Sequence, residues 1–411
     1  MADFLTLIPP EEARELLLSK VISSPVVKAE VDLLHALGRV SAEDILAPHP
    51  LPNFPRSTVD GFAVHARDTY GAAESMPAYL KLVGEVPMGD RPPLGIHSGE
   101  AMVIHTGGMV PEGADAIVML EYVQQSRGEE IEVNRAAAIG ENVILVGEDV
   151  VEGQVILAKG VKIRPAEIGG LAAFGISRLR VAKKVRVGLI SSGDEVVPSA
   201  GDIRLGQVRD INSYSLAALI ELSGGEPILY GIVPDHIDDL RSVTARALHE
   251  CDVVLITAGS SASTRDMTAQ VIDQIGVPGV LVHGINTKPG KPTILGVCDG
   301  KAVLGLPGNP VSALVNGMLF VVPLIEKLLG LPSGKPQATV PATLTVNLAS
   351  QAGREDWQPV KLVAGKEGWL AAPIFGKSNL IFTLASADGL ICIPPDSTGI
   401  GAGEQVDVYL I

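Results

Sequence analysis

The chain has 411 residues, with 32 Lys and Arg against 47 Asp and Glu, which gives a formal net charge of −15. This acidic balance argues against a nonspecific nucleic-acid binder, because such proteins need a dense basic face to neutralise phosphates. Hydrophobic residues make up 46% and charged residues 19%, a composition that excludes wholesale disorder. The length allows roughly two to four domains, and an anionic ligand would need local cationic groups or backbone amides.

The cysteine pattern and the N-terminal segment indicate a cytoplasmic protein. Cys251, Cys298 and Cys392 are far apart and have no metal-ligand spacing, so we expect buried thiols in a reducing compartment. The N-terminus lacks the basic stretch and apolar core of a signal peptide. The uncharged stretch 302–325 is long enough to raise the question of a membrane span, but prolines interrupt it. We therefore predict a buried strand, loop and helix there, and no membrane association.

The N-terminal half changes from helical to β texture. The first 40 residues have a helical pattern, including a second stretch over 29–37. Four prolines in 47–57 predict irregular structure, and the short apolar runs that follow are typical of a β module. The expected elements are strands over 79–84, 101–106, 116–120 and 131–133, then a strand, a turn and a short helix between 150 and 180.

The pattern after residue 180 predicts a doubly wound α/β domain. Apolar runs over 185–191, 227–233 and 252–258 alternate with helical segments over 213–222 and 237–249. Such alternation is typical of a parallel sheet, in which ligands bind beyond the carboxyl ends of the strands. After about residue 330, short strands with Gly and Pro turns predict a small C-terminal β module.

Two loops follow strands of this predicted sheet. In SSGDE, residues 191–195, small residues expose backbone amides and two carboxylates could hold a hydrated cation. The alternative is an ordinary turn between strand and helix. In TAGSSASTRD, residues 257–266, hydroxyls could surround an oxyanion and Asp266 could bind a metal or a hydroxyl group; the alternative is a flexible surface loop.

Two further segments combine lysine or helix-start chemistry with proline. KPGKP, residues 288–292, presents two lysines three apart on a stiff loop, which suits one anion; the alternative is a solvated basic turn. GLPGNPVSA, residues 305–313, places Asn309 as an N-cap and Pro310 at the first helical position. The amides of that helix start could bind an anion, and plain helix capping is the alternative.

In the N-terminal half, Asp60 precedes Gly61 in STVDGFA, and Thr106 follows a predicted strand in HTGG. Simple turn chemistry is the alternative for both. The sequence contains no HExxH zinc motif, no GxSxG elbow, no P-loop and no GxGxxG fingerprint.

Together these segments resemble the molybdopterin molybdenumtransferase family, which includes the MoeA proteins and the gephyrin E-domain. PNFPRSTVDGFAV, HTGGMVPEGADAIVMLE, GEDVVEGQVILAKG, SSGDEV, KPGKP and LPGNPVSA resemble its motifs in order, over essentially the whole chain. The resemblance implies a multidomain α/β chain with a central doubly wound, molybdopterin-binding-like domain over 181–330. It further implies a connecting domain from 1–47 with 149–180, an inserted β domain over 48–148 and a C-terminal β domain over 331–411.

The resemblance also implies an activity in molybdenum cofactor biosynthesis. Molybdenum from molybdate would be inserted into adenylylated molybdopterin, with Mg²⁺-dependent cleavage of the pyrophosphate bond and release of AMP. The family works as a homodimer, and molybdopterin adenylyltransferase and molybdenum apoenzymes are implied partners. The family's site lies between the α/β and C-terminal domains of one subunit and the inserted domain of the other.

The family's site residues carry over position by position. Those implied to act in the reaction are Asp60, Thr106, Asp149, Glu195, Asp235, Asp266, Lys288 and Lys291. The implied metal ligands are Glu195, Asp235 and Asp266. Those implied to bind the substrate are Ser192, Gly193, Gly259, Ser260, Pro307, Gly308, Asn309, Pro310 and Ser378.

Two segments depart from the family pattern. A loop resembling GGVSVGxxD is GSSASTRD here, and Ile144 and Leu145 replace two arginines of an NVRRxGED-like stretch. Three alternatives follow: a paralogue that binds molybdopterin or scaffolds partners with weak catalysis, a tungstate-inserting variant, and a molybdopterin adenylyltransferase. The last is a single-domain activity that would leave much of this chain unexplained.

Overall fold

The computed structural model describes residues 7–22, 26–258, 262–332 and 337–411. The chain divides into two compact units, the larger built from 1–42, 160–163 and 178–411, and the smaller from 43–159 and 164–177. The residues that we assigned to a connecting domain are divided between these units. The four-domain division is finer than this and stays a prediction.

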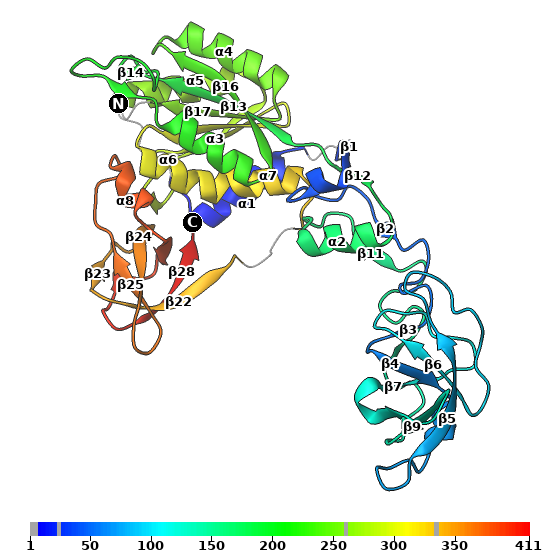
Figure 1. Ribbon diagram of the computed structural model, residues 1–411. Coiled ribbons are helices and arrows are strands. Elements are labelled where there is room, and N and C mark those ends of the chain that lie inside the picture. Colours follow the sequence, from blue (N-terminus) through cyan, green and yellow to red (C-terminus); the bar gives the residue numbers. More distant parts are fainter. Residues whose placement is uncertain (1–6, 23–25, 259–261, 333–336) are drawn as a thin grey trace. The chain divides into compact units, whose positions relative to one another are not determined.

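A six-stranded sheet forms the centre of the larger unit (Figure 1). Its strands in spatial order are β16 (Gly225–Val233), β13 (Val185–Ser192), β17 (Val253–Ala258), β21 (Lys301–Pro307), β20 (Ile294–Cys298) and β18 (Pro278–His283). The first four are parallel and the last two are antiparallel. The predicted doubly wound α/β region is therefore confirmed, with an antiparallel edge.

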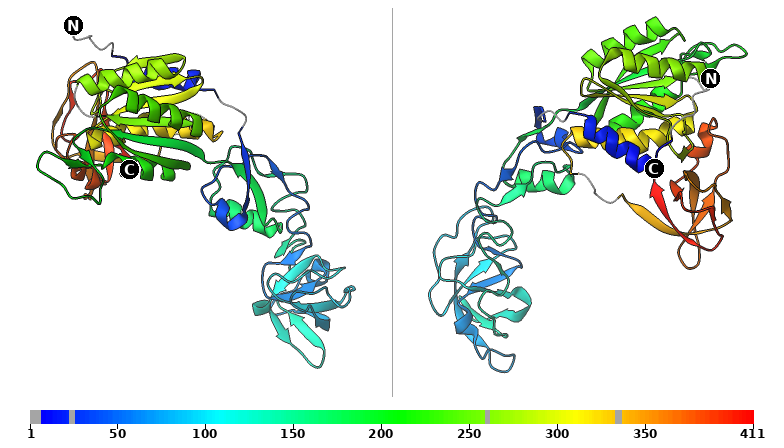
Figure 2. Two further views of the ribbon diagram at one scale, coloured as in Figure 1. Left: turned by 90° about the horizontal axis from the view of Figure 1, so that it is seen from above. Right: turned by 180° about the vertical axis from the view of Figure 1, so that it is seen from behind.

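Helices cover both faces of this sheet, as two views show (Figure 2). On one face lie α1 (Pro10–Lys20), α3 (Asn212–Leu222), α6 (Pro310–Asn316) and α7 (Val322–Leu328); on the other lie α4 (Ile237–Glu250) and α5 (Ala262–Ile275). Alternate residues of each strand enter opposite cores: Leu255 packs with the first set of helices and Ile256 with the second. Both faces are buried because the strands are continuously apolar.

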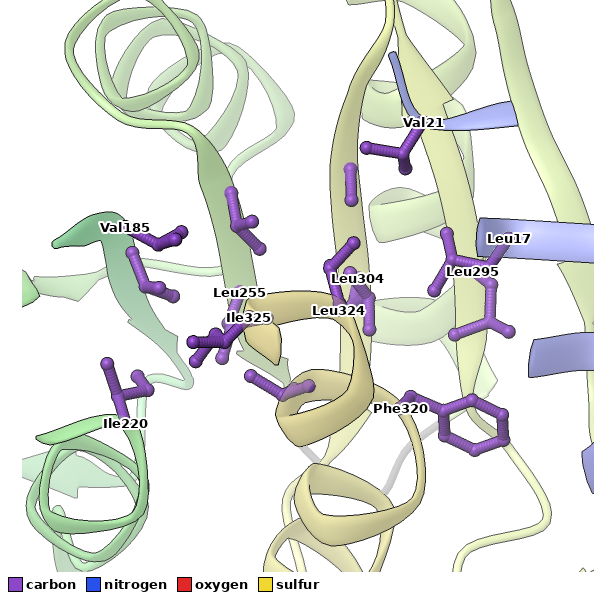
Figure 3. Packing of buried hydrophobic residues seen from close by; sticks show 14 of the residues in the cluster. Leu17, Val21, Val185, Ile220, Leu255, Leu295, Leu304, Phe320, Leu324 and Ile325 are labelled. Atoms are coloured by element: carbon purple, nitrogen blue, oxygen red, sulfur yellow. The ribbon is translucent and has the colours of Figure 1, made fainter. Parts of the chain in front are cut away.

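A π-helical turn, Gly317–Val321, joins α6 to α7, and Phe320 in this turn is fully buried. Figure 3 shows Phe320, Leu324 and Ile325 packed near Leu255 and Leu304 of the sheet. The helical segment Pro310–Leu328 is long and apolar enough to cross a membrane, but 56% of its window is buried inside this core. The prediction of a buried strand, loop and helix over 302–325 is confirmed.

The larger unit contains a second six-stranded sheet. In order its strands are β19 (Thr287–Lys288), β24 (Glu355–Ala364), β25 (Trp369–Pro373), β22 (Thr339–Leu344), β28 (Gln405–Leu410) and β26 (Gly389–Ile393). Short pairs add β23 (Leu348–Ala349) to β27 (Gly399–Ile400) and β14 (Val196–Val197) to β15 (Val208–Arg209), and α8 covers Ile381–Ala385. The predicted C-terminal β module is confirmed, and β19 connects it to the α/β region.

The smaller unit is mostly β. Its six-stranded sheet has the order β7 (Ala116–Met119), β4 (Gly61–Val64), β6 (Glu100–Ile104), β5 (Ala78–Glu85), β9 (Glu130–Val133) and β8 (Val123–Gln125). Short pairs join β2 (Ile45–Leu46) to β11 (Val155–Leu157) and β3 (Arg56–Ser57) to β10 (Val143–Ile144), and α2 spans Pro165–Ala173. The four strands predicted here are confirmed, while the proline tract 47–57 is irregular except for β3.

One helical prediction is wrong. Residues 29–37 form β1 (Lys28–Asp32), followed by a 3₁₀ turn (Leu33–Ala36), instead of a helix. β1 pairs antiparallel with β12 (Arg178–Ala182), so the backbone hydrogen bonds that a helix would make locally are made with a distant strand. This tertiary pairing overrides a short helical pattern.

The core around Phe320 gives a stability prediction. Phe320→Ala should lower the free energy of unfolding of the larger unit by about 3–5 kcal/mol, because a fully buried ring leaves a cavity. Phe382→Ala, at a ring that is 80% exposed, is the matched control and should change it by less than about 0.5 kcal/mol. Urea denaturation measures both, and equal effects would contradict the packing described.

Candidate functional site

The central sheet has a topological switch point at β13. The strand lies between β16 and β17, and the chain leaves it toward opposite edges of the sheet. At the carboxyl ends, the buried Ser191 Oγ lies 3.1 Å from Ser213 Oγ and 3.2 Å from Thr257 Oγ1. Crevices at such points are the usual ligand sites of doubly wound sheets.

The SSGDE loop and the end of β16 are hydrogen-bonded to each other. Ser192 Oγ donates to Asp235 Oδ1 at 2.7 Å, and the Asp235 N–H donates to Asp194 Oδ1 at 3.2 Å. Gly193 has φ +152°, and a Cβ there would lie 2.8 Å from Val196 Cγ2, so this turn requires glycine. Glu195 is exposed beside it. The structure thus brings Ser192, Gly193, Glu195 and Asp235 to one edge of the sheet.

The LPGN loop lies between this edge and the C-terminal sheet. Asn212 at the start of α3 donates through Nδ2 to the Gly308 carbonyl at 2.9 Å, and Pro307 ends β21. Asn309 is at the N-cap position of α6 and Pro310 is the first helical residue, as predicted.

The capping chemistry differs from the prediction. The Asn309 side chain makes no capping bond; its Nδ2 donates to Ser378 Oγ at 3.1 Å. The Val311 N–H donates to the Ser378 carbonyl at 3.1 Å, so this helix amide is already paired. Ser378 is therefore brought to the LPGN loop, and the start of α6 is a junction with the C-terminal region.

A cavity of about 1240 Å³ lies within the larger unit, between the LPGN and KPGKP loops and the C-terminal sheet. Pro307, Asn309 and Ser378 line it. Its charged lining residues are four cations and one carboxylate: Lys288, Lys291, Arg354, Lys377 and Asp356. A positive cavity in a chain of net charge −15 suits an anionic ligand.

The carboxylate of Asp356 holds two of these cations. Its side chain is 6% exposed, and Arg354 binds it in bidentate form, with Nε 2.7 Å from Oδ1 and Nη2 3.1 Å from Oδ2. Lys288 Nζ lies 3.4 Å from Oδ2. Asp356 thus fixes Arg354 and Lys288 side by side at the cavity wall.

Arg354, Asp356 and Lys377 were missing from the residues expected at the site. Arg354 and Asp356 are only two positions apart, but their role depends on β24 pairing with β19, which places Asp356 opposite Lys288. The signal in the sequence was weak: an Arg-x-Asp at the start of an apolar strand.

In the smaller unit, the structure brings Asp60 and Thr106 together. The Thr106 N–H and Oγ1 both donate to Asp60 Oδ1, at 2.7 and 3.1 Å. His105 Nδ1 is 3.7 Å from the same oxygen, and His105 Nε2 is 2.9 Å from Glu85 Oε1. The Thr106 backbone bond first, and then its hydroxyl bond, hold the pKa of Asp60 below its usual range.

The remaining predicted residues are less connected. Asp149 is an exposed residue of the smaller unit whose N–H donates to the Leu51 carbonyl at 3.1 Å. Asp266 is exposed on α5 of the larger unit. Gly259 and Ser260 lie outside the described residues.

Three comparisons with known proteins bear on these sites. Family models match the chain in three parts: the MoeA N-terminal region, domains I and II, over residues 8–175; a probable molybdopterin binding domain over 188–327; and the MoeA C-terminal region, domain IV, over 341–411. A Methanocaldococcus jannaschii protein named for molybdopterin biosynthesis is 37% identical, with 98% of each chain covered. The molybdopterin molybdenumtransferase of Haemophilus influenzae is 31% identical over 97% of each chain. The solved MoeA protein of Pyrococcus horikoshii OT3 has a TM-score of 0.87 at 35% identity, covering 99% of this chain and 100% of that one.

The Asp60 contacts predict a measurable titration. A depressed pKa means that folding favours the ionised carboxylate, so this contribution is present above the unfolded pKa and lost as pH falls through the folded one. Thr106→Ala should raise the pKa of Asp60 only part of the way, because the backbone bond, the larger cause, is kept. Carboxyl NMR titration measures this, and an unchanged pKa would show that the hydroxyl bond is absent.

Asp356 predicts a loss of stability. Asp356→Asn removes the charge that binds Arg354 and Lys288, and should lower the free energy of unfolding by about 3 kcal/mol. Asp407→Asn, at an exposed position of β28 in the same sheet, should cost less than about 0.5 kcal/mol. Chemical denaturation compares the two, and an equal cost would contradict the clamp.

Proposed function

This chain belongs to the MoeA family of molybdopterin molybdenumtransferases, and we propose that it catalyses the reaction of that family in molybdenum cofactor biosynthesis. Molybdenum from molybdate is inserted into adenylylated molybdopterin, and AMP is released. The observation that carries the proposal is the positively charged cavity lined by Lys288, Lys291 and Arg354 in an acidic chain. Both substrates are anionic, one through its pyrophosphate and the other as an oxyanion, so both need such a site.

The cationic side chains have distinct tasks in this proposal. Lys288 and Lys291 are point charges that bind anionic oxygens, while the planar fork of Arg354 is held in one orientation by Asp356. As the pyrophosphate bond breaks, negative charge grows on the departing phosphate. Cations already fixed in place stabilise that charge without reorganising.

We propose that Mg²⁺ assists, held by Glu195, Asp235 and Asp266. Among the side chains that the structure describes, no three His, Cys, Asp or Glu residues form a metal-binding group. Mg²⁺ nevertheless fits this donor set, because it usually keeps several waters and takes one or two carboxylates together with substrate phosphates. Bound there, it would neutralise phosphate charge.

We further propose that the chain acts as a cytoplasmic homodimer. A molybdopterin adenylyltransferase is the proposed source of its substrate, and molybdenum apoenzymes are the proposed recipients of its product. Light scattering of the purified protein tests the dimer directly.

A paralogue that binds molybdopterin with weak or no catalysis is the second candidate. Leu145, where the family pattern has an arginine, is an apolar side chain that is 59% exposed, and this observation favours it. Such a protein would bind adenylylated molybdopterin without releasing AMP. Tungstate insertion is a variant of the main proposal, because the two oxyanions have nearly the same size.

The test is a single-turnover assay with adenylylated molybdopterin, Mg²⁺ and molybdate. AMP release and reconstitution of a molybdenum-dependent apoenzyme should both depend on molybdate. Tight binding with no AMP release would contradict the transferase and support the binding paralogue. Replacing molybdate with tungstate in the same assay decides between the two oxyanions.

Lys291 predicts a kinetic effect. Lys291→Ala should lower kcat/KM about 10²-fold, because one fixed cation at the phosphates is lost. The matched control is Lys361→Ala, at an exposed lysine of β24 that does not line the cavity, and it should keep wild-type activity. A Lys291→Ala enzyme within about twofold of wild type would remove this lysine from the mechanism.

A further inference from the structure

Two buried side chains bind the backbone between Lys288 and Lys291. Thr293 Oγ1 donates to the Gly290 carbonyl at 2.8 Å, and Asn316 Nδ2 donates to the same carbonyl at 2.9 Å. Asn316 Nδ2 also donates to Thr293 Oγ1. Asn316 and Thr293 are both fully buried.

The proton positions in this network follow from its partners. Thr293 uses its only hydroxyl hydrogen on the Gly290 carbonyl, so its oxygen can accept, and the two Asn316 amide hydrogens go to Gly290 and to Thr293. The Asn316 side chain must therefore lie with its nitrogen toward the loop. Its orientation is determined by the three groups together.

Asn316 is a costly choice if only stability matters. Its Oδ1 is buried and has no hydrogen-bond partner among the residues that the structure describes. An unpaired buried acceptor costs about 1–3 kcal/mol, and an apolar side chain of the same shape would avoid this. The gain from the asparagine must therefore be sought in the geometry of the loop.

The loop is shaped to receive this side chain. Gly290 has φ +103°, and a Cβ at this position would lie 2.2 Å from Asn316 Nδ2. Only glycine permits both the backbone conformation and the close approach. On either side, the Ile285 N–H donates to the Lys291 carbonyl at 2.8 Å, so the loop is anchored at its middle and its end.

We propose that Asn316 is a positioning residue for the candidate site: it fixes the backbone between Lys288 and Lys291 and so sets the spacing of their two charges at the cavity. Asn316 ends α6, whose N-cap residue Asn309 binds Ser378, so one helix holds two walls of the cavity. The inference rests on the proposed function only in that these lysines bind the substrate's phosphate oxygens.

Inorganic pyrophosphate is the probe, and calorimetry with the full chain measures its Kd. Asn316→Leu keeps the volume but removes both donors, and should raise the Kd about tenfold or more, because misplaced charges bind less well. Thr244→Val is the matched control: it removes a buried hydroxyl bond to the Leu240 carbonyl on α4, away from the cavity. It should lower Tm and leave the Kd unchanged.

A double-mutant cycle separates positioning from a general loss of structure. If Asn316 acts through the loop, adding Asn316→Leu to Lys291→Ala should raise the Kd much less than it does in the wild type. Thr293→Val removes the other donor to Gly290 and should weaken binding in the same way, so it serves if Asn316→Leu does not fold. Fully additive effects of Asn316→Leu and Lys291→Ala would overturn the inference.

The outcomes distinguish this inference from the proposed function. If Lys291→Ala weakens pyrophosphate binding while Asn316→Leu and Thr293→Val bind as the wild type does, the positioning role is wrong and the proposed function stands. If Lys291→Ala itself binds as the wild type does, the lysine site is wrong and the positioning role is overturned with it.

Discussion

The buried carboxylate of Asp356 is the interaction on which the rest of the candidate site depends. It binds Arg354 and Lys288, two cations that would otherwise repel each other at close range. It also lies opposite Lys288 in the pairing of β19 with β24, where the α/β region joins the C-terminal sheet. One negative charge therefore joins the two regions and keeps a surplus of positive charge at the cavity.

Much of the fold and part of the site could be predicted because their causes are local. Continuous apolar runs alternating with helical segments predicted the doubly wound sheet, since strands buried on both faces need no alternation. The glycine at 193 and the proline at 310 marked a strand-end turn and a helix start, and the structure has both. Lys288 and Lys291 were predicted from their spacing on a stiff loop, and both line the cavity.

The rest depended on partners that are far away in the sequence. Residues 28–32 form a strand because β12, some 150 residues later, pairs with them. Asn309 is at a capping position, but its side chain binds Ser378, 69 residues away. Arg354 and Asn316 have no distinctive pattern of their own, because their roles arise from Asp356 paired across strands and from Gly290 packed against a helix. No local pattern in the sequence reports such contacts.

The most direct test of this account is a crystal structure of the protein with AMP and tungstate, using the anomalous scattering of tungsten to locate the oxyanion. The account predicts a tungsten peak in the cavity lined by Lys288, Lys291 and Arg354, with the AMP phosphate beside it. A peak outside this cavity, with the lysines unoccupied, would contradict the claim that its positive charge binds the substrates.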